Sequence, residues 1–137
     1  MTDSLPDPPL VAILRGITPA EAVATGEALL DAGFRILEVP LNSPDPLRSI
    51  AQLSAALGDR ALVGAGTVLD IADVGAVAAA GGRLIVSPNC NPDVIRETRR
   101  RGLWSFPGVF TPSEALAACA AGAHALKLFP ANVATPA

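Results

Sequence analysis

Apolar residues gather along this chain in six short runs that are separated by more polar stretches. The runs end at Arg15, Leu41, Val68, Pro88, Val109 and Pro130. Within each run, polar and apolar residues do not alternate regularly, which is typical of strands covered on both faces in a parallel sheet. The pattern therefore predicts six parallel strands.

Helix-start signals stand between these runs. Thr18 and Thr111 are each followed by a proline and, three positions on, by a glutamate, which is the pattern of a capping box with proline in the first turn. Asp70 and Asn91 are further candidate N-caps. The chain is therefore expected to alternate six strands with five helices, as α/β folds do.

Two charged residues occupy the same place in two of these units. Glu38 follows Gly33 by five residues, and Lys127 follows Gly122 by five. In a closed barrel the carboxyl ends of all strands face one shared site, whereas strands at opposite edges of an open sheet cannot share one. Because Glu38 and Lys127 lie four units apart, a shared site requires the barrel.

The repeat itself fits an α/β fold of either kind, a doubly wound sheet or a TIM (β/α)8 type barrel with about six β/α units in this chain, and a site shared by Glu38 and Lys127 favours the barrel. Residues 10–137 form the partial barrel and residues 1–9 an N-terminal extension. Strand alternation predicts the side chains that share a face. The sets, each ending in a polar residue expected at the common site, are Val11, Ile13 and Arg15; Ile36 and Glu38; Val63, Ala65 and Thr67; Ala125 and Lys127.

The basic residues are unusual in kind. Nine of the ten are arginine, and Lys127 is the only lysine. A GC-rich genome replaces lysine by arginine except where arginine cannot substitute, and only a lysine amine readily loses its proton or forms a Schiff base. Lys127 is therefore a candidate nucleophile.

Glu38 lies in an apolar strand, where an unpaired carboxylate is costly to bury. It is either a structural ion-pair partner of Arg15 or Lys127, or a general acid and base whose pKa desolvation raises toward neutrality. Arg15 is either a clamp for a substrate carboxylate or a surface arginine. The small residues Gly64-Ala65-Gly66 would let a ligand approach the backbone, where the Thr67 hydroxyl supplies a hydrogen bond.

Other features limit the function classes. The net charge of −3 argues against nucleic-acid or anionic-membrane binding. Leu69 stands where a dinucleotide fingerprint needs its third glycine, which argues against a nicotinamide cofactor. No apolar stretch reaches eighteen residues and no signal peptide is recognisable, so a cytoplasmic location is expected.

Six further residues are expected to be structural. Cys90 and Cys119 are too few for a disulfide framework or a zinc site, and we expect both to be small buried hydrophobic residues. His124 begins its strand, so it is expected at the opposite end of the barrel from the site. Residues 99–101, all arginine, are expected to form a solvated helix end.

The motifs together resemble those of the KDPG/KHG aldolases over residues 10–131. They are Arg15-Gly16-Ile17, Glu38-Val39-Pro40-Leu41-Asn42-Ser43-Pro44, Gly64-Ala65-Gly66-Thr67-Val68-Leu69, Ser87-Pro88-Asn89, Pro107-Gly108-Val109-Phe110-Thr111-Pro112 and Lys127-Leu128-Phe129-Pro130-Ala131. The resemblance implies a homotrimeric TIM barrel and a class I aldolase that uses neither metal nor cofactor. Its substrate would be a phosphorylated keto-deoxy sugar acid, split into pyruvate and glyceraldehyde 3-phosphate.

By this resemblance Lys127 forms the Schiff base, Glu38 transfers protons, and Arg15 and Thr67 hold the pyruvate carboxylate region. The same resemblance implies substrate contacts for Asn42, Ser87, Pro107 and Phe129. Gluconate-type members carry an arginine at the position of Asn42. A galactonate-type substrate is therefore expected, with a gluconate-type or 4-hydroxy-2-oxoglutarate substrate as the alternative.

The length departs from the family pattern. Eight-stranded barrels usually need roughly 200 residues or more, and this chain has 137. We expect either a fragment of a longer product or a barrel that another chain completes. A catalytically silent truncated barrel is therefore the alternative to an aldolase.

Overall fold

The computed structural model describes residues 4–134, along which strands and helices alternate. The strands are β1 (Val11–Ile13), β2 (Ile36–Pro40), β3 (Leu62–Gly66), β4 (Leu84–Val86), β5 (Trp104–Phe106), β6 (Gly108–Val109) and β7 (Lys127–Leu128). The helices are α1 (Pro19–Asp31), α2 (Pro46–Leu57), α3 (Ile71–Ala79), α4 (Pro92–Arg100) and α5 (Pro112–Ala121), with short 3-10 turns η1 (Gly58–Arg60) and η2 (Ala131–Val133). The predicted alternation is confirmed.

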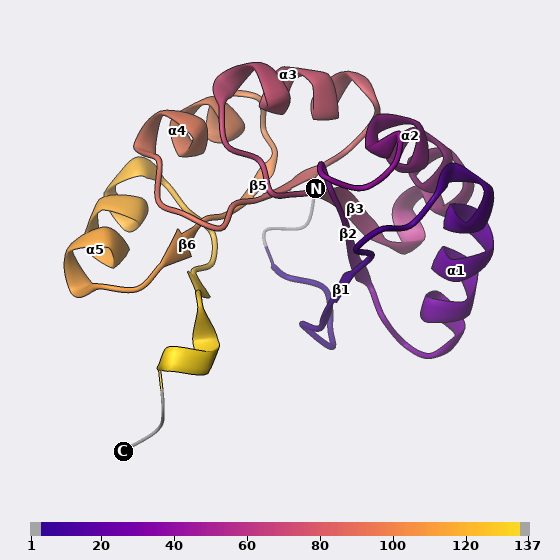
Figure 1. Cartoon of the computed structure of the whole chain (residues 1–137), viewed down its shortest axis with the longest axis horizontal. Helices are drawn as coiled ribbons and strands as arrows, with labels where there is room; N and C mark the ends of the chain where they lie inside the picture. Colours follow the sequence, from indigo (N-terminus) through magenta and orange to yellow (C-terminus); the bar gives the residue numbers. More distant parts are fainter. Residues whose placement is uncertain (1–3, 135–137) are drawn as a thin grey trace.

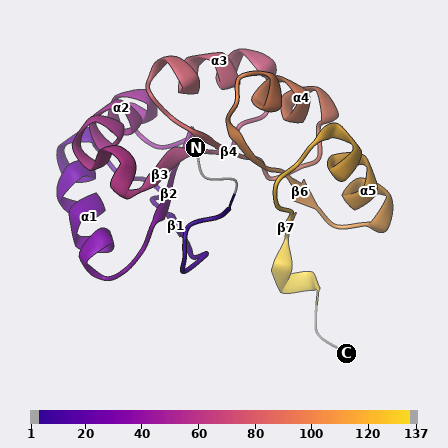
Figure 2. The ribbon, with the colours of Figure 1, turned by 180° about the vertical axis from the view of Figure 1, so that it is seen from behind.

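All strand pairs in this part of the chain are parallel. Five strands form one sheet in the order β1-β2-β3-β4-β5, and β6 pairs with β7 in a second sheet. The helices form an arc around the outer side of the strands (Figure 1). Seen from behind, the same arc encloses the strands, and the segment after β7 leaves at one end (Figure 2). This arrangement is part of a TIM-type barrel wall, which confirms the predicted fold class.

The fifth predicted strand is interrupted. The sequence predicts one strand in the run that ends at Val109, but the structure has β5 and β6 with Pro107 between them. Proline has no N–H to donate to a neighbouring strand, so regular pairing stops there. The Pro107 carbonyl still accepts a hydrogen bond from the Lys127 N–H at 2.9 Å. Lys127 therefore stays hydrogen-bonded to Pro107 despite the interruption.

The strands are mostly apolar because each of their two faces packs against other residues. One face packs under the helices, with Leu37, Val39 and Ile85 in its core. The other face lies on the concave side, and its core contains Ile36, Leu62, Leu84, Val86, Trp104 and Phe106. Leu5 and Ala125 pack against this second core. Adjacent residues of one strand thus enter different cores.

The predicted face of β3 is wrong. Val63 and Ala65 were expected to point into the barrel together with Thr67, but both lie in the core under the helices. Thr67 has a φ of 57°, in the left-handed region, so the alternation of faces ends before it. The direction of the Thr67 side chain therefore cannot be inferred from the alternation that begins at Val63.

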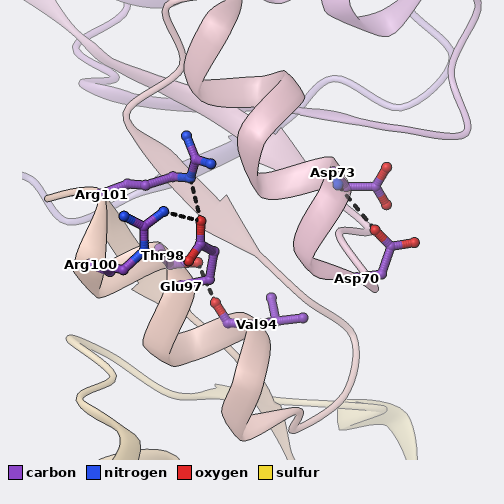
Figure 3. A network of polar contacts seen from close by, with 7 residues as sticks. All are labelled: Asp70, Asp73, Val94, Glu97, Thr98, Arg100 and Arg101. Atoms are coloured by element: carbon purple, nitrogen blue, oxygen red, sulfur yellow. Dashed lines mark hydrogen bonds and ion pairs between the residues drawn. The ribbon is translucent and has the colours of Figure 1, made fainter.

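The predicted helix caps are confirmed. Thr18 and Thr111 form capping boxes with the glutamates that follow them. The Asp70 carboxylate accepts a hydrogen bond from the Asp73 N–H at 3.1 Å (Figure 3). Asn91 accepts one from the backbone at the start of α4. Local sequence is enough to set these helix starts.

The end of α4 is exposed at residues 99–101, as predicted, and two of these arginines also form ion pairs. Glu97 pairs with Arg100 at 2.7 Å and with Arg101 at 2.6 Å (Figure 3). Hydrogen bonds from these guanidinium groups lower the pKa of Glu97 to about 2. On the buried side of the helix, the Thr98 hydroxyl donates to the Val94 carbonyl at 2.7 Å.

The two cysteines do not both behave as predicted. Cys90 is half-buried, but Cys119 is exposed on α5, so the prediction of a buried Cys119 is wrong. Five of the ten residues of α5 are alanine, and such a helix shows little contrast between its faces in sequence. Both thiols are free in the part of the chain that the structure describes.

Candidate active site

The concave side of the sheet holds an apolar hollow of about 290 Å³, which we call the inner hollow. It is lined by Leu5, Pro9, Val11, Ile13, Ile36, Glu38, Val86, Phe106, Ala125, Leu126 and Lys127. Glu38 and Lys127 are the two charged residues in this lining, among the residues described. Glu38 and Lys127, which the repeat of the units predicts to lie together, thus line the same hollow.

Glu38 is nearly dry. Its exposed fraction is 2%, and within residues 4–134 its Oε2 has no hydrogen-bond partner. Burial raises the pKa of Glu38 from 4.5 to about 7, against smaller lowering effects of the charges on Lys127 and Arg15. A carboxyl group with a pKa near neutrality can both accept and donate a proton at physiological pH.

Gly66 leaves the space that the Glu38 carboxyl occupies. A Cβ built on Gly66 would overlap that carboxyl, and one built on Gly64 would overlap the backbone of Leu84 on the neighbouring strand. This space was expected to admit an approaching ligand. In the structure the Glu38 carboxyl fills it, so the absence of a side chain at Gly66 makes room for that carboxyl.

Lys127 enters the inner hollow from a short strand. Its side chain is half-buried, and its Nζ lies 4.9 Å from the centroid of the Phe129 ring, within the range of a cation–π contact. The N–H groups of Lys127 and Phe129 donate to the carbonyls of Pro107 and Val109 at 2.9 and 3.2 Å. Pro107 and Phe129 are thus in contact with Lys127.

Three of the predicted substrate-binding residues lie on loops that follow strands. Arg15 is exposed after β1, yet its charge still reaches Glu38. Thr67 is half-buried at the end of β3 in its left-handed conformation. Asn42 is exposed after β2. Arg15, Thr67 and Asn42 are absent from the described lining of the inner hollow itself.

Ser87 has a structural contact that the sequence did not indicate. It is buried, and its hydroxyl donates to the Val68 carbonyl at 2.7 Å. The Val68 N–H in turn donates to the Val86 carbonyl at 3.2 Å. Because the hydroxyl hydrogen of Ser87 is already used, Ser87 fixes the segment that carries Thr67.

Ser43 was missed as a contributor to the site. Its buried hydroxyl accepts a hydrogen bond from the Gly16 N–H at 3.1 Å, which joins the loops after β1 and β2. Arg15 lies directly before this attachment. The sequence offered only the position of Ser43 between Asn42 and a proline, which does not reveal a contact 27 residues away.

A family model described as KDPG and KHG aldolase matches residues 1–136 of the chain. The chain belongs to the KDPG and KHG aldolase family. A probable 2-dehydro-3-deoxy-6-phosphogalactonate aldolase of Rhizobium meliloti is 53% identical over 98% of this chain and 65% of its own length. The 2-dehydro-3-deoxy-6-phosphogalactonate aldolase of Escherichia coli is 51% identical over 93% of this chain and 62% of its own. This KDPG and KHG aldolase chain thus spans somewhat less than two thirds of those relatives.

Solved structures of the family agree with the fold. One described as native KDPGal has a TM-score of 0.94 at 49% identity, over 97% of this chain and 65% of its own. The KDPG aldolase of Legionella pneumophila, with pyruvate captured as a covalent carbinolamine intermediate, has a TM-score of 0.82 at 29% identity. The match covers 90% of this chain and 60% of that one.

Proposed function

We propose that this chain carries the Schiff-base centre of a class I aldolase that cleaves 2-dehydro-3-deoxy-6-phosphogalactonate to pyruvate and glyceraldehyde 3-phosphate. The observation that carries the proposal is that Lys127 and Glu38 share one apolar hollow. An amine with a neighbouring carboxyl of near-neutral pKa is the pair that imine formation and proton transfer require. The carbinolamine found in the Legionella pneumophila relative supports the same chemistry.

The reaction begins when the Lys127 amine attacks the C2 carbonyl carbon of the substrate. Loss of water gives an iminium ion, which accepts the electron pair of the C3–C4 bond as that bond breaks. Glu38 as the carboxylate takes the proton of the C4 hydroxyl, and the aldehyde leaves. Glu38 as the acid then returns a proton to C3 of the enamine, and hydrolysis releases pyruvate and the free amine.

The other predicted residues have separate roles in this proposal. Arg15 and Thr67 hold the carboxylate region of pyruvate, by a guanidinium fork and a hydroxyl group. Phe129 and Pro107 orient Lys127, which they contact. Ser87 acts through Thr67, whose segment it fixes. Asn42 faces the sugar part of the substrate from its exposed loop.

The choice of epimer rests on the relatives. Relatives named for the phosphogalactonate substrate are 51–53% identical, whereas one named 2-dehydro-3-deoxy-phosphogluconate aldolase, from Treponema pallidum, is 33% identical. Cleavage assays with the two epimers, each coupled to detection of pyruvate, test the choice. A faster reaction with the gluconate epimer would contradict it.

The Schiff base is tested by incubating the protein with pyruvate and borohydride. One pyruvyl adduct should form and map to Lys127, with the α-amine as its sole competitor because the chain has no other lysine. Lys127→Arg keeps the charge but cannot form the imine, so the adduct should disappear. An unmodified Lys127 in folded wild-type protein would refute the assignment.

A homotrimer and a cytoplasmic location are further parts of the proposal. A designed cage made by fusing symmetric oligomeric domains matches this chain with a TM-score of 0.91 at 50% identity, which is consistent with an oligomer-forming fold. Among residues 4–134, none of the helices is long and apolar enough to cross a membrane. Light scattering of the purified protein tests the oligomeric state.

A further inference from the structure

The side chain of His124 joins the segment that carries Lys127 to β5. Its Nδ1 accepts a hydrogen bond from the Ser105 N–H at 3.0 Å. The backbone N–H of His124 donates to the Ser105 carbonyl at 2.9 Å. In a regular parallel sheet, the Ser105 N–H would meet a backbone carbonyl of the neighbouring strand. The imidazole takes that place at the junction between the two sheets.

The ring is held in one orientation. It packs on the indole of Trp104 with 4.4 Å between ring centroids and an interplanar angle of 37°. Nδ1 accepts the hydrogen bond from the Ser105 N–H, so this ring nitrogen carries no hydrogen. The Arg99 guanidinium of α4 contacts the ring at Nε2, so its positive charge faces the imidazole. A protonated ring would lose the Ser105 bond and be repelled by Arg99.

The strand beyond His124 has few other attachments to β5 and β6. β7 has two residues, and the backbone bonds of Lys127 and Phe129 to Pro107 and Val109 hold it. Ser105 is buried and His124 is exposed, so the Ser105 N–H loses its part-buried hydrogen-bond partner if His124 moves away. The bond to His124 therefore has energetic consequences for the whole segment.

We infer that His124 is a positioning residue for Lys127: its imidazole fixes the start of this segment against β5, three residues before the amine that enters the inner hollow. The inference deepens the proposed function and rests on the role proposed there for Lys127. His124 itself lies before β7 and is absent from the described lining of the inner hollow, so it acts through the backbone of this segment.

The inference includes a pH dependence. The groups packed on His124 are Trp104 and Ser105 from β5, which are uncharged, and Arg99 from α4. Burial, and then the Arg99 charge, lower the pKa of His124 from 6.5. The folded state therefore binds the proton less well than the unfolded one. The attachment is complete above pH 6.5 and is lost as pH falls through the lowered pKa.

Two variants separate the parts of this attachment. His124→Asn places an acceptor oxygen near the position of Nδ1 and has no charge to gain. His124→Phe keeps an aromatic ring for Trp104 but has no acceptor. Amide hydrogen exchange of the peptides that contain residues 105 and 124–128, corrected for intrinsic exchange, reports the attachment. Borohydride trapping of pyruvate at Lys127 reports its effect on the amine.

We expect His124→Phe to lower both protection and trapping rate about tenfold at pH 8, on the scale of losing one part-buried hydrogen bond. His124→Asn should keep both, and should lack the fall in protection that wild type shows between pH 7 and 5. Wild-type protection and trapping in His124→Phe would overturn the inference. If His124→Phe does not fold, the inference is overturned when wild type and His124→Asn show the same change in amide protection between pH 7 and 5.

The readouts also separate this inference from the proposed function. Absence of trapping in folded wild-type protein refutes the Schiff base, while hydrogen exchange still reports whether His124 holds the segment. Trapping that is normal in wild type and equal in all variants refutes the positioning role alone.

Discussion

The two groups proposed to carry the chemistry lie in regions of opposite character. β2, which carries Glu38, is buried at all five positions and pairs with a strand on each side. β7, which carries Lys127, has only two residues. Its second residue, Leu128, and the following Phe129 are exposed. A carboxyl needs a dry and rigid setting to keep a raised pKa, whereas an amine that attacks a substrate must be reachable. The chain provides each setting separately.

The largest difference should appear in stability. Leu53, 0% exposed, packs in the core under the helices, and Leu128 is 52% exposed. Leu53→Ala should cost about 2–5 kcal/mol of unfolding free energy because it leaves a cavity. Leu128→Ala should stay within about 0.5 kcal/mol. Urea unfolding of both variants measures the two losses of unfolding free energy. Equal losses would contradict the difference between the two regions.

The dry setting of Glu38 should make stability depend on pH. Its pKa is raised in the folded state to about 7, so the folded state binds its proton more tightly. This contribution is complete below pH 4.5 and is lost as pH rises to about 7, with a magnitude on the order of 3 kcal/mol. The difference in unfolding free energy between wild type and Glu38→Gln, at pH 4 and pH 8, isolates it. A difference independent of pH would contradict the raised pKa.

The separation of the two groups should also be visible in the chemistry. Glu38→Gln should still form the pyruvyl adduct at Lys127, because the amine is unchanged. Exchange of the pyruvate methyl protons with deuterated solvent should slow by roughly 10²-fold, the scale of general acid–base catalysis. Proton NMR measures this rate. An unchanged exchange rate would return Glu38 to a structural ion-pair role.

The smallest effect concerns the hydrogen bond from Ser87 to Val68. Ser87→Ala leaves the Val68 carbonyl without this donor and should cost about 1 kcal/mol of unfolding free energy. Because Thr67 loses its support, the pyruvate concentration that gives half-maximal trapping should also rise. Ser113→Ala on an exposed turn of α5 is the matched control and should change neither quantity.

Local signals explain what the sequence could predict. The caps at Thr18 and Thr111, the alternation of strands and helices, and the meeting of Glu38 with Lys127 all follow from patterns a few residues long, repeated along the chain. A barrel then brings equivalent ends together, so the position of each residue in its own unit was sufficient.

What the sequence did not reveal depends on contacts between units. The face of β3 required knowledge that Thr67 is left-handed, and the role of Gly66 required the Glu38 carboxyl lying against it. The first is a backbone conformation, and the second is a contact between the neighbouring strands β3 and β2. Ser43 is likewise explained only by its partner Gly16, on another loop. No single segment carries the information about such a partner.

The arrangement of reactive side chains has a practical consequence for attaching the protein to a surface. Lys127 is the only lysine and points into the inner hollow, so amine-directed coupling takes place there or at the α-amine. Sensor chips prepared in this way would consume the very group under study. Cys119 is an exposed thiol on α5, in the outer arc of helices (Figure 1). Maleimide coupling at Cys119 would instead immobilise the protein with its concave side open to the analyte.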